Sequence, residues 1–153
     1  MPSNYTDMDS FRAIGRVMAR YAQDHAASAD ADGVIESAPL LKAWKPGSMA
    51  EPASYAVGDV RTNENQPWKC VQAHTHYGEG GWNPAAASAR ALWEPYHATR
   101  REYALPYVPP TNAEDAYKAG EWMIWTDGLA YRCLGNAVTF GPDVLPDAWE
   151  VAT

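Results

Sequence analysis

The chain has 153 residues, of which 46% are hydrophobic and 20% are charged, a composition typical of folded rather than disordered proteins. Its formal net charge is −7. Proteins that bind nucleic acid need a basic surface to neutralise phosphate, so this acidic balance argues against a nucleic-acid partner. A neutral polymer such as a glycan fits the charge better.

The sequence carries no recognisable membrane or export signal. No apolar run approaches the roughly 18 residues that a membrane-spanning helix needs, so no membrane partner is expected. The stretch from Met1 to Asp7 lacks the basic and apolar regions of a signal peptide. We therefore expect a protein that is made in a cytoplasm.

The first predicted element is a helix over residues 9–26. Phe11, Ile14, Met18 and Tyr21 follow the 3-4-3 spacing of a heptad stripe. Two interpretations of the stripe remain open. Either the helix packs on its own domain, or it associates with copies of itself or with a larger assembly. The second interpretation predicts a homo-oligomer formed through the helix.

After the helix the pattern changes twice. Residues 26–33 are rich in Ala, Asp and Ser and are expected to break the helix, and a short apolar segment follows over residues 34–41. Pro46 and Gly47 end any helix there. From that point Pro and Gly recur every few residues and apolar runs shrink, which predicts short strands joined by turns. The expected strands cover residues 57–61, 68–73, 121–125 and 130–134.

The aromatic residues are unusual in kind and place, with seven Trp and nine Tyr but only two Phe. Rings that carry a polar atom suit half-exposed positions, such as interfaces and sugar-binding platforms. All the Trp residues lie between Trp44 and Trp149. The N-terminal helix and the rest of the chain are therefore expected to have different roles.

The main signal is an internal repeat. Each copy has an aromatic residue three positions before a Gly-acid pair, then an aromatic residue two positions before a Cys, and a closing Trp-Glu pair. These residues are Tyr55, Gly58, Asp59, Trp68, Cys70, Trp93 and Glu94 in the first copy, and Tyr117, Gly120, Glu121, Tyr131, Cys133, Trp149 and Glu150 in the second. Chance rarely gives so many features in one order. The two cysteines are too few for a disulfide framework and are expected to be buried thiols.

The repeat predicts the fold class and the domains. We expect a mainly β fold with an N-terminal α-helix, in which two small antiparallel β modules with short strands and an aromatic core follow in tandem. The predicted domains are a helical attachment or oligomerisation segment (1–33), a first module with its preceding segment (34–98), and a second, divergent module (103–153).

The first copy resembles a known family. The stretch Trp68-Lys69-Cys70-Val71-Gln72-Ala73-His74-Thr75, followed by Trp82-Asn83-Pro84 and Ala91-Leu92-Trp93, is similar to the chitin-binding modules of carbohydrate-binding families 5 and 12. It is closer still to a phage variant, which occurs in small tail, baseplate or fibre-associated proteins. Those proteins often have a leading helix and an apolar-x-x-Trp-x-Pro-Gly motif, which residues 41–47 match. The first copy resembles the family over residues 44–96, and the second over 107–151 in skeleton only.

The resemblance implies carbohydrate binding, and the residues indicate where. Exposed aromatic planes stack on the apolar C–H faces of pyranose rings, while nearby polar groups orient the hydroxyls. Trp82 is the best candidate because it lies in a Gly-rich loop with polar neighbours. The alternative is a loop Trp folded back on the core. Tyr77 and His74 are secondary candidates.

The second module contributes two further candidates. Trp122 and Trp125 lie three apart in a predicted strand and so face opposite sides, which leaves one of them, Trp125 in our assignment, exposed. Phe140 is the counterpart of Trp82 in a loop over residues 136–142. This module lacks the Gln-Ala-His-Thr string, so it is either a structural duplicate or binds something else. The remaining repeat aromatics are expected to be mainly core: Trp44, Tyr55, Trp68, Trp93, Tyr117, Tyr131 and Trp149.

We expect no catalysis, no metal binding and no cofactor. His74 and His76 occupy alternate positions that can converge on zinc, but a third ligand is needed. The sequence has no Gly-x-Ser-x-Gly, phosphate-loop or His-Glu-x-x-His motif. Glu79 lies near Trp82, yet a paired-carboxylate glycosidase needs a deep cleft, which units of about fifty residues do not form.

These observations leave three hypotheses for function. The first is a non-catalytic phage virion protein of the tail, baseplate or fibre, whose helix attaches or oligomerises while the modules bind host-surface glycan or cell-wall polysaccharide. The alternative is a structural virion protein, such as a head decoration, whose modules are adaptors to other virion proteins. A glycan-targeting subunit of a secreted hydrolase is weaker, because the sequence shows neither a signal peptide nor a catalytic domain. The first hypothesis predicts an exposed Trp82, and the second a Trp82 buried against another chain.

Overall fold

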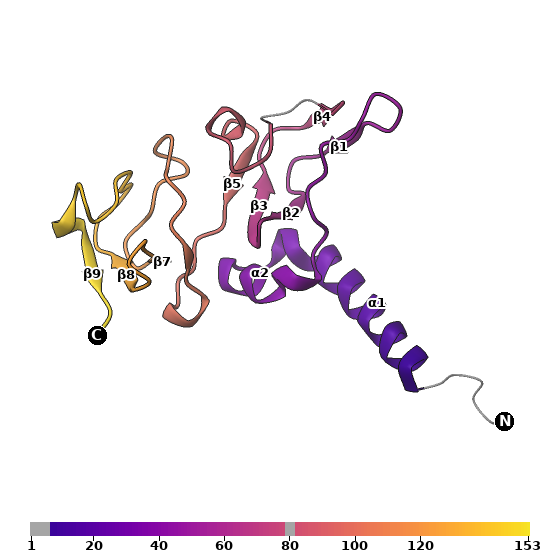
Figure 1. Cartoon of the computed structure of the whole chain (residues 1–153), viewed down its shortest axis with the longest axis horizontal. Coiled ribbons are helices and arrows are strands. Elements are labelled where there is room, and N and C mark those ends of the chain that lie inside the picture. The colour runs from indigo at the N-terminus through magenta and orange to yellow at the C-terminus, as the bar shows by residue number, and fades with distance from the viewer. Residues whose placement is uncertain (1–6, 79–81) are drawn as a thin grey trace.

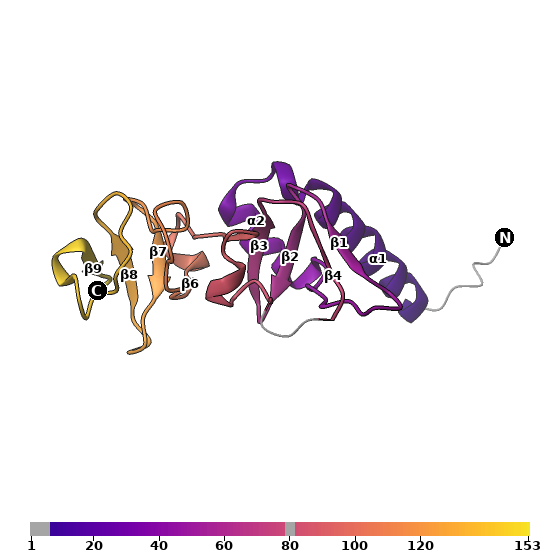
Figure 2. The same ribbon diagram turned by 90° about the horizontal axis from the view of Figure 1, so that it is seen from above.

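The computed structural model describes residues 7–78 and 82–153, which form an elongated chain with helix at one end and sheet at the other (Figures 1 and 2). Its elements are α1 (Asp7–His25), α2 (Ala31–Ser37), β1 (Ala53–Tyr55), β2 (Val60–Asn63), β3 (Gln66–Cys70), β4 (His74–His76), β5 (Trp93–Pro95), β6 (Leu105–Pro106), β7 (Trp122–Ile124), β8 (Ala130–Cys133) and β9 (Trp149–Val151). Single 3-10 turns cover Ala26–Ser28, Ala38–Leu40, Ala87–Ala89, Arg101–Tyr103 and Pro146–Ala148. The predicted class, mainly β with an N-terminal helix, is confirmed.

The hydrogen bonds that hold helix α1 to the first module lie near its C-terminal end. The helix begins two residues before the predicted start, and none of its residues is buried. The Gln23 side-chain amide donates to the Val60 carbonyl at 3.0 Å, and its oxygen accepts from the Lys42 N–H at 2.8 Å. The long N-terminal part of α1 extends away from the modules (Figure 1). Neither helix among the described residues is long and apolar enough to cross a membrane.

The predicted break at residues 26–33 is shorter than expected. A 3-10 turn continues from α1, and α2 then begins at Ala31 because the Asp30 carboxylate caps it, accepting from the Gly33 N–H at 2.7 Å. Helix α2 therefore crosses the domain boundary that we placed after residue 33. Its Val34 packs with Ala26 and with residues of the first module in one small cluster. The helical segment and the first module thus share a core.

The described residues form three sheets. The first module has the pair β1–β4 and the sheet β2–β3–β5, all antiparallel, and the second has the sheet β6–β7–β8–β9, in which only β6 runs parallel to its neighbour. The strand predicted at 57–61 begins only at Val60. Residues 56–59 instead form a turn in which Gly58 takes a φ of +93°, a conformation that glycine adopts without strain.

The tandem repeat is confirmed at the level of main-chain hydrogen bonds. In both modules the turn glycine donates to the cysteine carbonyl and the cysteine N–H donates to the acidic residue that follows the glycine. These bonds are Gly58–Cys70 at 2.8 Å and Cys70–Asp59 at 2.7 Å, and Gly120–Cys133 at 2.8 Å and Cys133–Glu121 at 2.7 Å. Each cysteine also pairs across the sheet with the closing Trp, Trp93 or Trp149. The copies therefore share one strand register.

Each module has its own aromatic core. The first core contains Tyr55, Trp68, Cys70, Ala89 and Trp93, and the second Tyr117, Met123, Cys133, Val138 and Trp149. Burial raises the pKa of both thiols, although each also donates to a main-chain carbonyl two residues on, at Gln72 or Gly135, which lowers it in part. Of the aromatics expected in the core, Trp44 and Tyr131 are only half-buried.

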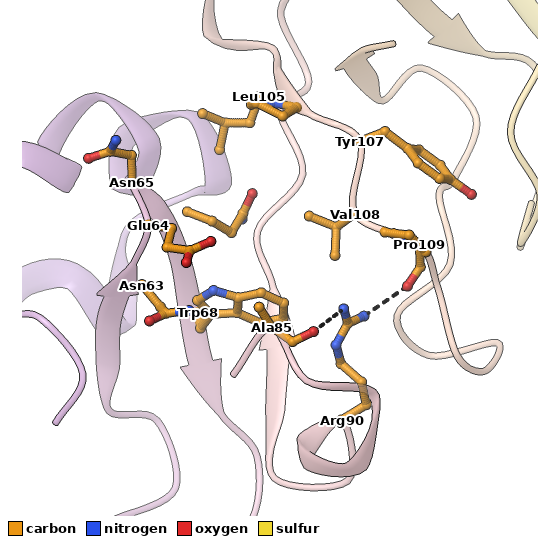
Figure 3. Close-up of a pocket in the computed structure, with 12 residues that line it drawn as sticks. Asn63, Glu64, Asn65, Trp68, Ala85, Arg90, Leu105, Tyr107, Val108 and Pro109 are labelled. Atoms are coloured by element: carbon orange, nitrogen blue, oxygen red, sulfur yellow. Dashed lines mark hydrogen bonds between the residues drawn. The ribbon is translucent and has the colours of Figure 1, made fainter. Parts of the chain in front are cut away.

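The two modules are joined by buried polar contacts. Arg90 of the first module and Asp115 of the second form an ion pair at 3.0 Å, and their side chains are only 5% and 3% exposed. The same guanidinium lies 4.9 Å over the Trp68 ring and donates to the carbonyls of Pro109 and Ala85 (Figure 3). We call this set of contacts the module joint.

The connection between the modules is also held in place. His97 stacks on Tyr117 with ring centroids 3.8 Å apart, and its Nδ1 lies 2.9 Å from the Glu121 carboxylate. Thr99 donates from its N–H and its hydroxyl to Asp32 of α2, at 2.7 and 2.5 Å. The segment that separates the predicted modules is therefore not a free linker.

Candidate functional site

Three of the predicted binding residues lie together around β4, and two of these three line one groove. This groove, of about 450 Å³, is lined by His74, Thr75, His76, Trp82 and Leu92. We call it the Trp82 groove. Its size is that of a small-ligand site. Strand β4 supplies one wall, and Trp82 and Leu92 come from the segment that leads back to β5.

The pairing of β1 with β4 sets the direction of the two histidines. Tyr55 lies opposite His74 and Ala53 opposite His76. Side chains alternate along a strand, so the two imidazoles share one face and Thr75 points to the other, where its hydroxyl lies 2.9 Å from that of Ser54. The short β1–β4 sheet thus turns both rings toward the aromatic core of the first module.

His74 is a wall of the groove rather than a freely displayed side chain. Its ring is half-buried, edge-on to His76 at 4.8 Å and to Trp93 at 5.3 Å. Its Nδ1 lies 2.6 Å from the Gln72 carbonyl, and a carbonyl can only accept, so Nδ1 is the donor. In the neutral ring Nε2 is then an acceptor. That atom is buried and has no hydrogen-bond partner among the described residues.

Trp82 projects from a fixed support. The indole is 42% exposed, so it is not folded back on the core. The two residues after it are anchored: the Asn83 side chain and carbonyl both accept from the Ala86 N–H, at 3.2 and 2.9 Å, and Pro84 is fully buried. An exposed aromatic plane on a fixed turn needs little ordering when a ligand binds, which favours affinity.

Tyr77 and Glu79 do not contribute to the described lining of the groove. Tyr77 follows β4 directly and is 45% exposed, but it is not one of the groove residues. Glu79, which raised the glycosidase alternative, lies outside the described residues.

The candidates of the second module lie elsewhere. Trp125 is only partly exposed, because its ring packs on the second core, 4.8 Å from Tyr107 at an angle of 69°. A Cβ on Gly141 would come within 2.3 Å of the same ring, so the loop backbone covers it. Phe140 is 53% exposed, and its carbonyl accepts from the Trp149 indole at 2.9 Å.

The second module also lacks the imidazole wall. Where Tyr55 pairs with His74 in the first module, Tyr117 forms a bridge with Val138 in the second. Val138 is buried and offers no nitrogen. The two modules therefore differ at the position of the groove, whereas their aromatic cores are similar.

Sequence reasoning missed three groove residues: Thr75, His76 and Leu92. The alternation His74-x-His76 was a usable signal, because it places two rings on one face of a strand, but we considered it only as a possible metal pair. In the described part of the chain, no group of three or more His, Cys, Asp or Glu side chains is arranged to hold a metal ion.

A second cavity lies between the modules, next to the module joint (Figure 3). It has about 440 Å³ and is lined by Trp68, Arg90, Val108 and Pro109 among others, with Glu64 and Asn65 from the turn between β2 and β3. Trp68 is only 1% exposed and its ring is covered by Arg90, so it offers no free plane. The Trp82 groove is therefore the better candidate for binding a sugar.

No protein-family model matches this chain, and no curated protein matches it either.

Proposed function

We propose that the chain is a non-catalytic glycan-binding protein whose first module binds sugar in the Trp82 groove. The observation that carries the proposal is a 42% exposed indole on an anchored turn, beside a groove of about 450 Å³. A cavity of that size lies within the range of small-ligand sites.

The groove residues have complementary roles in this proposal. The Trp82 indole stacks on the apolar face of a pyranose ring, which is the geometry that aromatic platforms favour. His74 forms one wall of the groove. Its Nε2 has no hydrogen-bond partner among the described residues and is closed to solvent, so it accepts from a sugar hydroxyl only once the groups that cover it move aside on binding. Leu92 adds apolar surface to the groove. This set binds and orients a sugar.

We also propose that the protein is a component of a phage virion, in the tail, baseplate or fibre. The proposal is supported by the resemblance of residues 44–96 to phage carbohydrate-binding modules. The helix that precedes the first module adds support, because α1 leaves an unpaired apolar side that an assembly can use. The net charge of −7 fits a neutral glycan on the host surface better than a polyanion.

The alternative is a structural virion protein whose modules bind other virion proteins. The module joint is compatible with this function too, because a rigid pair of modules suits an adaptor as well as a binder. The two functions differ in what contacts Trp82: a sugar in the first, and another protein chain in the second.

The test is binding to a glycan array and to purified cell-wall polysaccharide. The wild type is expected to bind, and Trp82→Ala to weaken binding by about twofold to tenfold, since a lost aromatic contact of about 0.5–1.5 kcal/mol corresponds to that change in Kd. Leu129→Ala is the control, because it removes a similarly exposed apolar side chain, 49% exposed, from a position of the second module that is not a binding candidate. Undiminished binding by Trp82→Ala would contradict the site. Absence of wild-type binding to any glycan would favour the adaptor.

A further inference from the structure

Helix α1 carries an apolar side that nothing in the described part of the chain covers. Its large apolar side chains are between 52% and 69% exposed. They are Met8, Phe11, Ile14, Val17, Met18 and Tyr21. Their spacing places them on one half of the helix surface, while Arg12, Arg16 and Arg20 lie on the other half. A contiguous exposed apolar surface of this length is typical of an interaction site.

The two ends of this apolar side differ in shape. Toward its C-terminus α1 forms one wall of a groove of about 580 Å³, whose other wall is α2 with the turn that follows it. The helix groove is lined mainly by apolar residues, including Met18, Tyr21, Val34 and Leu40. Toward its N-terminus α1 extends away from the modules (Figure 1), so Met8, Phe11 and Ile14 form a ridge without a second wall.

We propose that a second copy of this chain occupies the helix groove, in a two-fold dimer in which the two α1 helices run antiparallel. A ridge and a groove on the same helix complement each other only when two helices pack in opposite directions. Each copy then seats its ridge in the groove of the other, as a self-complementary two-fold interface requires. A parallel pair would place ridge against ridge and leave both grooves empty.

The middle of α1 supports this crossing. Gly15 borders the apolar side, and a Cβ there would meet nothing within 4 Å in the described chain. Glycine destabilises a helix relative to alanine, so its presence in an exposed helix needs another reason. In the antiparallel dimer the two-fold axis passes near Gly15, where the missing side chain lets the two backbones approach.

The area that the contact can cover also favours a second copy. An aromatic ring alone buries about 150–250 Å², so covering the ridge and the groove residues approaches the roughly 800 Å² per partner of a stable interface. This inference does not rest on glycan binding, because the Trp82 groove lies on β4, away from α1 (Figure 1).

The first test is the mass of the whole chain in solution. Light scattering is expected to give twice the 16.8 kDa chain mass. Phe11→Asp is expected to raise the dimer dissociation constant about a hundredfold or more, because a symmetric dimer loses the anchor twice. Phe11 is 69% exposed, so the change leaves the fold intact. Phe140→Asp is the control and stays dimeric. A wild type that is monomeric at every concentration would overturn the proposal.

The second test gives the helix direction. Met8→Cys and Leu40→Cys are made as separate chains, mixed and oxidised. Because native Cys70 and Cys133 are buried free thiols, the new cysteines dominate the reaction. A disulfide between the two different variants supports the antiparallel dimer. A disulfide of Met8→Cys with itself, or a trimeric mass, indicates parallel helices and contradicts it. Glycan binding by Phe11→Asp, measured per chain, shows separately whether the Trp82 groove functions.

Discussion

The Trp82 groove combines one exposed ring with one buried nitrogen. His74 is fixed from three sides: Nδ1 is bonded to the Gln72 carbonyl, and the ring lies against His76 and Trp93. Because the ring cannot turn without losing these contacts, Nε2 keeps its direction. A fixed acceptor selects for a ligand hydroxyl at one position, which gives the site orientation as well as affinity.

We expect His74→Phe to weaken glycan binding up to about tenfold, because it keeps the ring but removes a hydrogen bond of about 0.5–1.5 kcal/mol. Calorimetric titration with the glycan identified on the array measures the change. Unchanged affinity would show that Nε2 makes no contact with the sugar. Comparison with the Trp82→Ala variant then separates the polar from the stacking contribution.

The buried hydroxyl and thiol groups make the fold sensitive to alkaline pH. Burial raises the pKa of Cys70 and Cys133, and it raises that of Tyr96 to about 12, with a further contribution from Glu94. A raised pKa means that the folded chain holds the proton more tightly than the unfolded chain. The associated stability is complete below the ordinary pKa and is lost as pH rises toward the folded value.

We therefore expect the free energy of unfolding to fall as pH rises above about 8.5, where an unfolded thiol begins to ionise. Urea unfolding at pH 7, 9 and 10 measures this slope. A Cys70→Ala variant, less stable at pH 7, should show a shallower decline. An unfolding free energy that rises over the same interval would contradict the assignment.

Among the elements, α2 depends most clearly on a single side chain. The Asp30 carboxylate caps the helix. Asp32, in the first turn of α2, accepts a hydrogen bond from the Thr99 N–H. We expect Asp30→Ala to destabilise the chain by about 1 kcal/mol, because the Gly33 N–H loses its acceptor. Urea unfolding measures this loss. Asp30→Ser restores an acceptor and should recover most of the stability, and equal losses in both variants would argue against capping.

The elements differ in how well the sequence predicted them. Helix α1 was placed to within two residues because its stripe is long and regular. Strands β7 and β8 were placed to within a residue or two at each end. Strands such as β1, β4 and β9 have three residues each and show no alternation long enough to detect. The positions of these short strands depend on pairing with strands that are distant in the sequence.

The candidate site was also only partly predictable, because some of its residues are placed by the pairing of strands that are distant in the sequence. Trp82 could be proposed because a Gly-rich loop gives a Trp no apolar strand to pack on. The wall formed by His74 and His76 depends on the pairing of β4 with β1, which joins segments about twenty residues apart. Trp125 is less exposed than its place in the predicted strand indicated, because Gly141, a residue of a different loop, lies against its ring.

At the scale of the whole molecule, the module joint couples the two repeats. Burial opposes the charge of Asp115, yet hydrogen bonds from Asn112, Thr111 and Arg90 outweigh it and hold its pKa below the ordinary value. A buried pair that loses one partner leaves an uncompensated charge. The joint is therefore expected to make the modules unfold together rather than one after the other.

We expect Asp115→Asn to cost about 3–5 kcal/mol, because Arg90 then stays buried without its counter-charge. Calorimetry measures the loss and shows whether the single transition divides into two. Glu150→Gln is the matched control: it removes the exposed partner of Arg132 and should cost less than about 1 kcal/mol. Similar small costs for both variants would indicate that the modules are energetically independent.

The attachment of α1 through Gln23 has a consequence for how the protein engages a polymer. Because this residue bonds to both Val60 and Lys42, α1 keeps a set direction relative to the first module. In the proposed dimer the two Trp82 grooves are then held at a constant spacing. Once one groove is occupied, the second meets the same chain at high effective concentration, but only if the sugar repeat matches that spacing. Affinity for a polymer would therefore depend on its repeat length, whereas affinity for a short oligosaccharide would not.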